Sequence, residues 1–168
     1  GRPGWHTECV CMIDDIFHKP IDIHGGGFDL RFPHHENEIA QNYCLHHDNL
    51  ANYWIHNARL DLRGEKMSKS LGNVVWLKDI IVEYHPNAFR LAILANHYRQ
   101  VINYQDDMMR QMQGEWEKIE KLYVSVFRKL ELCDALDGGK PLELMDNFLT
   151  EMAYDFNTSN AITHLYAI

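Results

Sequence analysis

Three residues in the first third of the chain have the types and the spacing of ligands for one metal ion. His34 and Glu38 are four residues apart at the start of a predicted helix, so their side chains should lie one turn apart on one face. Cys9 lies in a preceding helical segment, which the packing of a strand–helix–strand unit can bring close. A thiolate, an imidazole and a carboxylate suit Zn²⁺. The sequence therefore predicts a zinc site, although the same residues are common on solvated helix faces and in cores.

Other histidines and cysteines crowd the same stretch. Eight of the 11 histidines precede residue 57, and His6, His24 and His35 could orient metal ligands. Cys11 is two residues from Cys9, so on a helix it points largely away from that residue. Four cysteines without a secretion signal favour a reducing compartment, where thiols are free or bound to metal. We therefore expect a cytoplasmic protein.

A second set of candidate residues forms the string Lys66-Met67-Ser68-Lys69-Ser70, in a loop after a predicted strand. Two ammonium groups and two hydroxyls within five residues make an effective clamp for polyphosphate. Preorganised donors that face a developing oxyanion are typically worth ~10²–10³ in rate each. A solvated lysine–serine loop is the default interpretation of looser patterns, but this string is far more specific.

The composition is that of a folded domain. Of 168 residues, 46% are apolar and 24% are charged, which excludes disorder, collagen and a disulfide scaffold. Asp and Glu outnumber Lys and Arg by 24 to 16, which excludes a wholly basic nucleic-acid coat but not a local basic patch. No apolar run has the length of a membrane span, so no membrane partner is expected. The first residue is not Met, and we expect a fragment or a processed chain.

The first third of the chain alternates helical and strand-like patterns, which favours parallel strand–helix–strand units. A helix is predicted over residues 5–17, a strand over 21–24, a glycine turn over 25–27, a helix from 32 to about 47 and a strand over 52–62, followed by a turn at 63–64. This pattern predicts a Rossmann-like α/β half at the start of the chain.

From about residue 75 the periodicity becomes helical. Helices are predicted over residues 77–84, 86–94, 106–132 and 142–154, with a linker at 137–141 and a helix N-cap within residues 157–159. The stripe from Trp116 to Leu130 is interpreted as the core of a helical bundle rather than a platform for stacking bases. A helical module is therefore expected to follow the α/β half, with the boundary between residues 75 and 100.

Several strings in the chain resemble one family. GRPGWHTEC, HGGGFDLRFPHHENEIAQ, YWIH and KMSKSLGN resemble the second half of the catalytic core of cysteinyl-tRNA synthetases, which are class I aminoacyl-tRNA synthetases. The stretches at 96–99, 103–104 and 155–158 resemble the helical region that follows. The resemblance implies three segments: residues 1–75 as the second half of a Rossmann-like parallel-sheet catalytic domain, 76–100 as a connecting helical region, and 101–168 as a truncated helical bundle on the tRNA-contacting side.

The resemblance also implies roles for individual residues. Cys9, His34 and Glu38 match the active-site zinc ligands of the family, and Lys69 matches the lysine that contacts ATP. Together with Lys69, the signature loop supplies Lys66 as a second catalytic and ATP-binding lysine and Ser68 as an ATP contact. The remaining matches are Trp5, His6 and His24 around the amino-acid pocket, Gly27 and Asp29 near the ribose of ATP, and His56 near its adenine.

The implied activity is ATP-dependent activation of cysteine and its transfer to tRNA(Cys). The partners would be cysteine, tRNA(Cys) and ATP with Mg²⁺, and the protein would be a monomer. One Zn²⁺ per chain would take its fourth ligand from an N-terminal half that this sequence lacks, together with the HIGH-type ATP motif. The isolated chain is therefore expected to be inactive.

Two alternatives remain open on the sequence. The cysteine ligase of mycothiol synthesis shares similar strings and the same zinc and ATP chemistry, although Glu36–Gln41 looks more like the synthetase. A chain without the HIGH-type half could also be a non-catalytic remnant that binds tRNA or a nucleotide.

Overall fold

The computed structural model describes residues 3–68, 70, 72–133 and 143–166. The chain divides into two compact units, Gly1–Arg59 and Leu60–Ile168. The first unit holds the predicted metal ligands, and the second holds the described part of the lysine–serine loop. The three-segment division at residues 75 and 100 stays a prediction. No helix in the described ranges is both long and apolar enough to cross a membrane.

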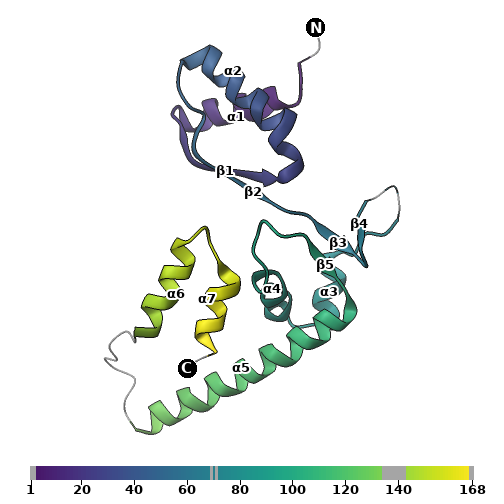
Figure 1. Ribbon diagram of the computed structural model, residues 1–168, viewed down its shortest axis with the longest axis vertical. Coiled ribbons are helices and arrows are strands. Elements are labelled where there is room, and N and C mark those ends of the chain that lie inside the picture. The colour runs from purple at the N-terminus through teal and green to yellow at the C-terminus, as the bar shows by residue number, and fades with distance from the viewer. Residues whose placement is uncertain (1–2, 69, 71, 134–142, 167–168) are drawn as a thin grey trace. The chain divides into compact units, whose positions relative to one another are not determined.

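The first unit is a parallel strand–helix–strand unit preceded by a helix, as the sequence predicts. Its elements are α1 (His6–Phe17), β1 (Ile21–Gly27), α2 (Glu36–His46) and β2 (Ala51–Asn57). The strands β1 and β2 are parallel, with Ile21 opposite Ala51 and Gly27 opposite Asn57. Both helices lie on the same side of the two strands (Figure 1). Two short helical turns, η1 (Phe28–Leu30) and η2 (Arg31–His35), connect β1 to α2.

The predicted glycine turn at residues 25–27 is wrong, because all three glycines extend β1 and pair with β2. None of the three has the positive φ that a turn would need, and Gly27 is extended at φ −65° and ψ 151°. At least one of these positions requires glycine because other side chains pack closely against the backbone there. A Cβ on Gly26 would lie 3.0 Å from both His35 Cε1 and Leu30 Cδ1. The glycine therefore leaves room for the His35 ring beside the strand.

The single strand predicted over residues 52–62 is also wrong, because the segment forms two strands in different sheets. The strand β3 (Leu60–Leu62) pairs in parallel with β5 (Ile102–Tyr104) and antiparallel with β4 (Glu65–Lys66). The predicted turn between β3 and β4 is confirmed, with positive φ at both Arg63 (51°) and Gly64 (84°). Two consecutive residues with positive φ are typical of the type I′ turn that joins tight hairpins.

The helices of the second unit follow the predicted pattern closely. They are α3 (Leu77–Glu83), α4 (Pro86–Leu94), α5 (Asp106–Leu132), α6 (Glu143–Ala153) and α7 (Thr158–Leu165). An N-cap is predicted within residues 157–159, and the structure places it at Asn157, whose side chain accepts a hydrogen bond from Asn160 N. The linker predicted at residues 137–141 lies outside the described residues. A buried cluster joins α3, α4, α5 and β5 through Ile80, Tyr84, Ala92, Tyr104 and Met109.

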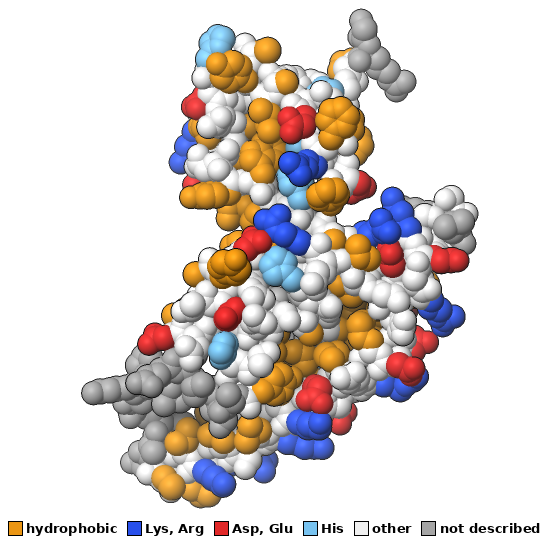
Figure 2. Space-filling model, viewed as in Figure 1, with side chains coloured by type: hydrophobic (Ala, Val, Ile, Leu, Met, Phe, Trp, Pro, Cys, Tyr) orange, Lys and Arg blue, Asp and Glu red, His pale blue; other side chains and the backbone are white. Residues whose placement is uncertain are grey.

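The stripe predicted as bundle core from Trp116 to Leu130 is not buried in its second half. Tyr123 and Val126 are 67% and 46% exposed, and Leu130 is 38% exposed. Apolar side chains accordingly lie on the surface near the C-terminal end of α5 (Figure 2). The long helix packs on α4 through its first half, and periodicity alone could not reveal where that packing ends.

Candidate functional site

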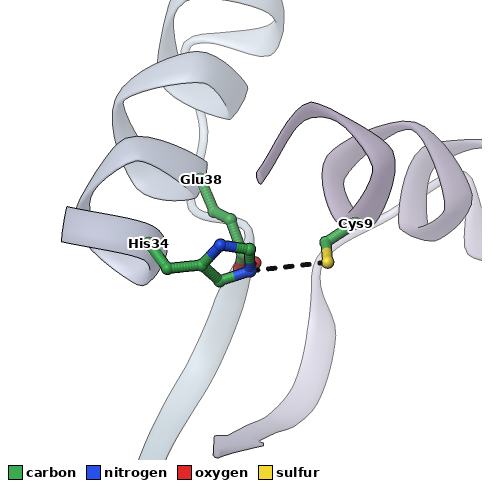
Figure 3. A group of neighbouring side chains, drawn as sticks. All are labelled: Cys9, His34 and Glu38. Atoms are coloured by element: carbon green, nitrogen blue, oxygen red, sulfur yellow. Dashed lines mark hydrogen bonds and ion pairs between the residues drawn. The ribbon is translucent and has the colours of Figure 1, made fainter. Parts of the chain in front are cut away.

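The three predicted metal ligands converge in the first unit, although they come from separate elements. Cys9 lies on α1, His34 lies at the end of η2, and Glu38 lies in the first turn of α2. Cys9 Sγ is 3.6 Å from His34 Nε2, which is in turn 2.7 Å from Glu38 Oε1 (Figure 3). One potential ligand atom from each residue lies within 4.8 Å of the other two.

The carboxylate of Glu38 is fully buried, which is unusual for an acidic side chain. Its Oε2 lies 2.6 Å from His24 Nε2, in a hydrogen bond from β1 to α2. Its Oε1 has no hydrogen-bond partner among the described residues, even though His34 Nε2 is close. A buried carboxylate oxygen without such a partner is costly, and it needs either a cation or another donor. The donor set of sulfur, nitrogen and oxygen therefore fits a zinc ion at this point.

The electrostatics of the cluster oppose a free thiolate. Burial raises the pKa of the Cys9 thiol, and the negative charge of Glu38 raises it further. A metal ion reverses this preference, because a coordinated thiol loses its proton. A cation between Cys9, His34 and Glu38 would therefore favour the thiolate form of Cys9, which the cluster otherwise disfavours.

A second histidine cluster adjoins the first and shares Glu38. His35 is 3% exposed, and its Nδ1 lies 2.8 Å from His56 Nε2. Burial lowers the pKa of His35, and the neighbouring imidazoles lower it further while Glu38 opposes them. His24, His35 and Glu38 also lie close enough to ligate one ion. The set with Cys9 is the stronger candidate, because Oε2 of Glu38 is already hydrogen-bonded to His24 and Oε1 is not.

The residues predicted around the amino-acid pocket lie beside the same cluster. The ring centroids of Trp5 and His34 are 4.1 Å apart, and those of His6 and His34 are 6.4 Å apart. Both Trp5 and His6 lie at the N-terminal end of α1, and Trp5 is 60% exposed. His24 is hydrogen-bonded to Glu38 and therefore contacts the predicted metal ligand directly.

The residues predicted near the nucleoside lie at the carboxyl ends of β1 and β2. Gly27 ends β1, Asp29 follows it in η1, and His56 is the penultimate residue of β2. A Cβ on Gly27 would lie 2.5 Å from Asp29 Oδ1, so this glycine leaves room for the carboxylate. Ligands of open parallel sheets bind at the carboxyl ends of the strands, which is where these three residues lie.

The lysine–serine loop belongs to the second unit. Lys66 ends β4 with an exposed side chain, and Ser68 N–H donates to Asn73 Oδ1 over 2.9 Å. The hydroxyls of Ser68 and Ser70 are 3.2 Å apart. Lys69, the predicted ATP contact, lies outside the described residues.

Sequence reasoning gave too little weight to His35 and Asn73. His35 was expected only as a neighbour of the ligands, but it is the buried residue that contacts His24, His56 and Trp54. The feature of the sequence that pointed to His35 was its position directly after His34. Asn73 hydrogen-bonds both Lys66 and Ser68, and its signal was its place at the end of the KMSKSLGN string.

Comparison with known proteins gives a consistent set of relatives. A protein named cysteine–tRNA ligase from Acholeplasma laidlawii is 51% identical over 163 residues, which cover 97% of this chain and 38% of that protein. A protein of the same name from Aquifex aeolicus is 42% identical over 176 residues, covering 100% of this chain and 36% of that protein. The chain therefore spans less than two fifths of the length of these relatives.

A solved structure supports the fold. The LeuRS chain of a ternary complex with tRNA and LeuAMS from Agrobacterium radiobacter matches 89% of this chain and 22% of its own length, with a TM-score of 0.73. The two sequences are only 19% identical, so this likeness shows a shared fold of mixed α/β type and no more.

The sequence profile of one family matches residues 1–114, which include the two histidine clusters and the lysine–serine loop. Its description is the catalytic domain of class I (C) tRNA synthetases. This match and the relatives named cysteine–tRNA ligase confirm the resemblance seen in the sequence strings. The chain belongs to the class I tRNA synthetase (C) catalytic-domain family.

Proposed function

We propose that this chain is part of a cysteinyl-tRNA synthetase, which activates cysteine with ATP and transfers it to tRNA(Cys). The convergence of Cys9, His34 and Glu38, with one buried carboxylate oxygen left without a hydrogen-bond partner, carries this proposal. The name cysteine–tRNA ligase, which these relatives carry, supports it. We propose further that residues 1–75 are half of a Rossmann-like domain and that a helical bundle follows.

In this proposal Cys9, His34 and Glu38 hold one Zn²⁺, and the rest of the cluster supports them. When bound with an open position, zinc supplies a soft Lewis acid that prefers the thiolate of cysteine to the hydroxyl of serine. The His24 imidazole holds Oε2 of Glu38, which leaves Oε1 directed at the ion position. The rings of Trp5 and His6 lie beside that of His34 and would enclose the amino acid. Cysteine and serine differ by one atom, so shape alone discriminates poorly between them, and the zinc ion supplies the selectivity for cysteine.

The phosphate chemistry is assigned to the second unit. The cysteine carboxylate attacks the α-phosphorus of ATP, and the bond to the bridging oxygen of pyrophosphate breaks. Lys66 and Lys69 balance the negative charge that develops on pyrophosphate, and Ser68 contacts a phosphate oxygen. Gly27, Asp29 and His56 bind the nucleoside, and Mg²⁺ accompanies ATP. Positioning and charge placement supply the rate, because no protein nucleophile takes part.

The chain supplies only part of this machinery. It spans 38% of the relative from Acholeplasma laidlawii. We propose that an N-terminal half outside this sequence contributes the HIGH-type ATP motif and a fourth zinc ligand, and that the residues of this sequence alone do not activate cysteine. The four free cysteines agree with a cytoplasmic protein, and we propose that it acts as a monomer.

Cysteine-dependent exchange between ATP and pyrophosphate tests the activity. No exchange by the pure chain, with exchange restored when the N-terminal half is added, supports the proposal. No exchange by the combined halves, despite correct folding, leaves only a non-catalytic binding protein. The acceptor is tested separately, because charging of tRNA(Cys) supports a synthetase and ligation to glucosaminyl-inositol supports the mycothiol-pathway enzyme. The names of the relatives favour tRNA.

The zinc site is tested by metal analysis and by amino-acid binding. We expect close to one zinc per chain when the site is complete and a preference for cysteine over serine that disappears when zinc is removed. A preference that survives complete removal of zinc would place the discrimination elsewhere.

A further inference from the structure

The side chain of Asn73 joins two backbone positions of the lysine–serine loop. Its Oδ1 accepts a hydrogen bond from Ser68 N–H over 2.9 Å, and its Nδ2 donates to the Lys66 carbonyl over 3.2 Å. One planar amide therefore holds both groups, with only Met67 between them. Asn73 is half-buried, whereas the side chain of Lys66 is exposed. The backbone is thus fixed while the ammonium group stays accessible.

The neighbouring structure explains why this contact is needed at that point. Before Lys66, the chain is held by the β3–β4 pairing, in which Lys66 lies opposite the buried Asp61. The hairpin turn is held as well, because Gly64 N–H donates to Asn103 Oδ1 over 2.6 Å. After Lys66 the strand ends, and the amide of Asn73 continues the support.

The residue before Asn73 allows the chain to return toward Lys66. Gly72 has φ +66°, a conformation that side chains other than glycine adopt at a cost. Apart from its chain neighbours, no described residue has an atom within 4 Å of the position that a Cβ would take, so the conformation rather than the space requires glycine. Gly72 therefore supplies the backbone turn, and Asn73 supplies the two hydrogen bonds to the backbone of Lys66 and Ser68. We call these two hydrogen bonds the clasp.

We propose that Asn73 is a positioning residue, which holds the backbone of Lys66 and Ser68 in the conformation that binds the phosphates of ATP. The inference rests on the proposed function, because it takes that loop as the phosphate site. In this proposal Asn73 acts through the backbone of Lys66 and Ser68, to which its amide is hydrogen-bonded. Preorganisation of this kind raises affinity by reducing the entropy lost on binding.

The clasp itself is tested by amide hydrogen exchange at Ser68 in the full chain. In Asn73→Ala the Ser68 amide should exchange faster, because it loses its acceptor. In Asn73→Asp the acceptor remains, so the Ser68 amide should stay protected although the bond to the Lys66 carbonyl is lost. Unchanged exchange at Ser68 in Asn73→Ala would overturn the inference.

The effect on ligand binding is tested with ATP and three variants, each combined with the N-terminal half that is proposed to complete the ATP site. Asn73→Ala should weaken ATP binding about fivefold for each lost hydrogen bond, while zinc content stays unchanged. Asn96→Ala is the matched control, because Asn96 also bonds its side chain to backbone in the same unit, donating to Ala92 O over 2.9 Å. That control should leave the ATP affinity unaltered.

Lys66→Ala separates this inference from the proposed function. If Lys66→Ala weakens ATP binding and Asn73→Ala does not, only the role of Asn73 is wrong. If neither variant changes the affinity, or if the unaltered chain combined with the N-terminal half does not bind ATP, the assignment of the phosphate site fails and takes the inference with it.

Discussion

Oε2 of Glu38 lies 2.6 Å from Nε2 of His24, and this contact between α2 and β1 fixes the orientation of the carboxylate. One oxygen is engaged, so the other is directed at His34 and Cys9. Because Glu38 is fully buried, its carboxylate loses its contacts with water, and both oxygens need a hydrogen-bond donor or a cation. The geometry is that of a ligand held ready by a neighbouring imidazole.

Glu38→Gln is expected to lower the zinc affinity of the chain at least ~100-fold, because a neutral amide is a poor substitute for an anionic ligand. The measurement is zinc content after gel filtration, followed by competition with a chelator. Glu36→Gln is the matched control, since Glu36 is exposed in the same turn of α2. His34→Ala should behave like Glu38→Gln. Unchanged zinc content and affinity in both Glu38→Gln and His34→Ala would rule out the proposed zinc site.

Lys69→Ala, tested with the N-terminal half present, is expected to slow adenylate formation by ~10²–10³. Cysteine binding should stay near normal, because the proposed amino-acid pocket is built from the histidine cluster. The rate is measured by ATP–pyrophosphate exchange, and cysteine affinity by calorimetry. Lys78→Ala, on the exposed surface of α3, should change neither quantity. A defect in cysteine binding alone would contradict the assigned role of Lys69.

Asp155 should make the second unit less stable in acid. Arg99 Nε donates to Asp155 Oδ2 over 2.7 Å and Tyr98 OH donates to Oδ1 over 2.6 Å. These hydrogen bonds, that from Arg99 most of all, lower the pKa of Asp155 from 3.8 to about 2. Because the folded-state pKa is depressed, the stabilisation is fully present above pH 3.8 and is lost as the pH falls toward 2.

The variant for this test is Asp155→Asn, which tolerates the positive φ of 54° at that position. We expect its melting temperature to lie below that of the unaltered chain at pH 5, and the difference to shrink steadily between pH 4 and pH 2. Glu120→Gln, on the exposed surface of α5, serves as the control and should show no such convergence. A difference that is constant over this range would mean that Asp155 does not stabilise the fold through its charge.

Two glycine substitutions should have opposite effects. Gly26→Ala places a Cβ 3.0 Å from the His35 ring and from Leu30, so we expect a loss of about 1–3 kcal/mol and weaker zinc binding. Gly114→Ala lies inside α5, where the new Cβ would meet no described atom within 4 Å beyond the backbone of its own helix, so it should gain about 0.5–1 kcal/mol through helix propensity. Urea unfolding and zinc titration measure both effects. Equal stability of the two variants would show that strand β1 can shift to accept a side chain.

The sequence by itself determined most of the local elements and which residues are proposed as metal ligands. The four-residue spacing of His34 and Glu38 predicted a shared helix face, and their 2.7 Å contact confirms it. The helices of the second unit also followed from their periodicity, because a side-chain repeat of 3.6 residues is a local property. The strings around Cys9 and Lys66 were specific enough to identify the family.

Only the tertiary structure decided which distant groups meet. No local pattern shows that His24 takes one oxygen of Glu38, that His35 needs Gly26 beside it, or that Asn73 closes the loop after Lys66. The segment 52–62 reads as one strand, yet its two parts find partners in different sheets. Strand pairing and the burial of α5 depend on contacts between residues far apart in the chain, and periodicity carries no information about such contacts.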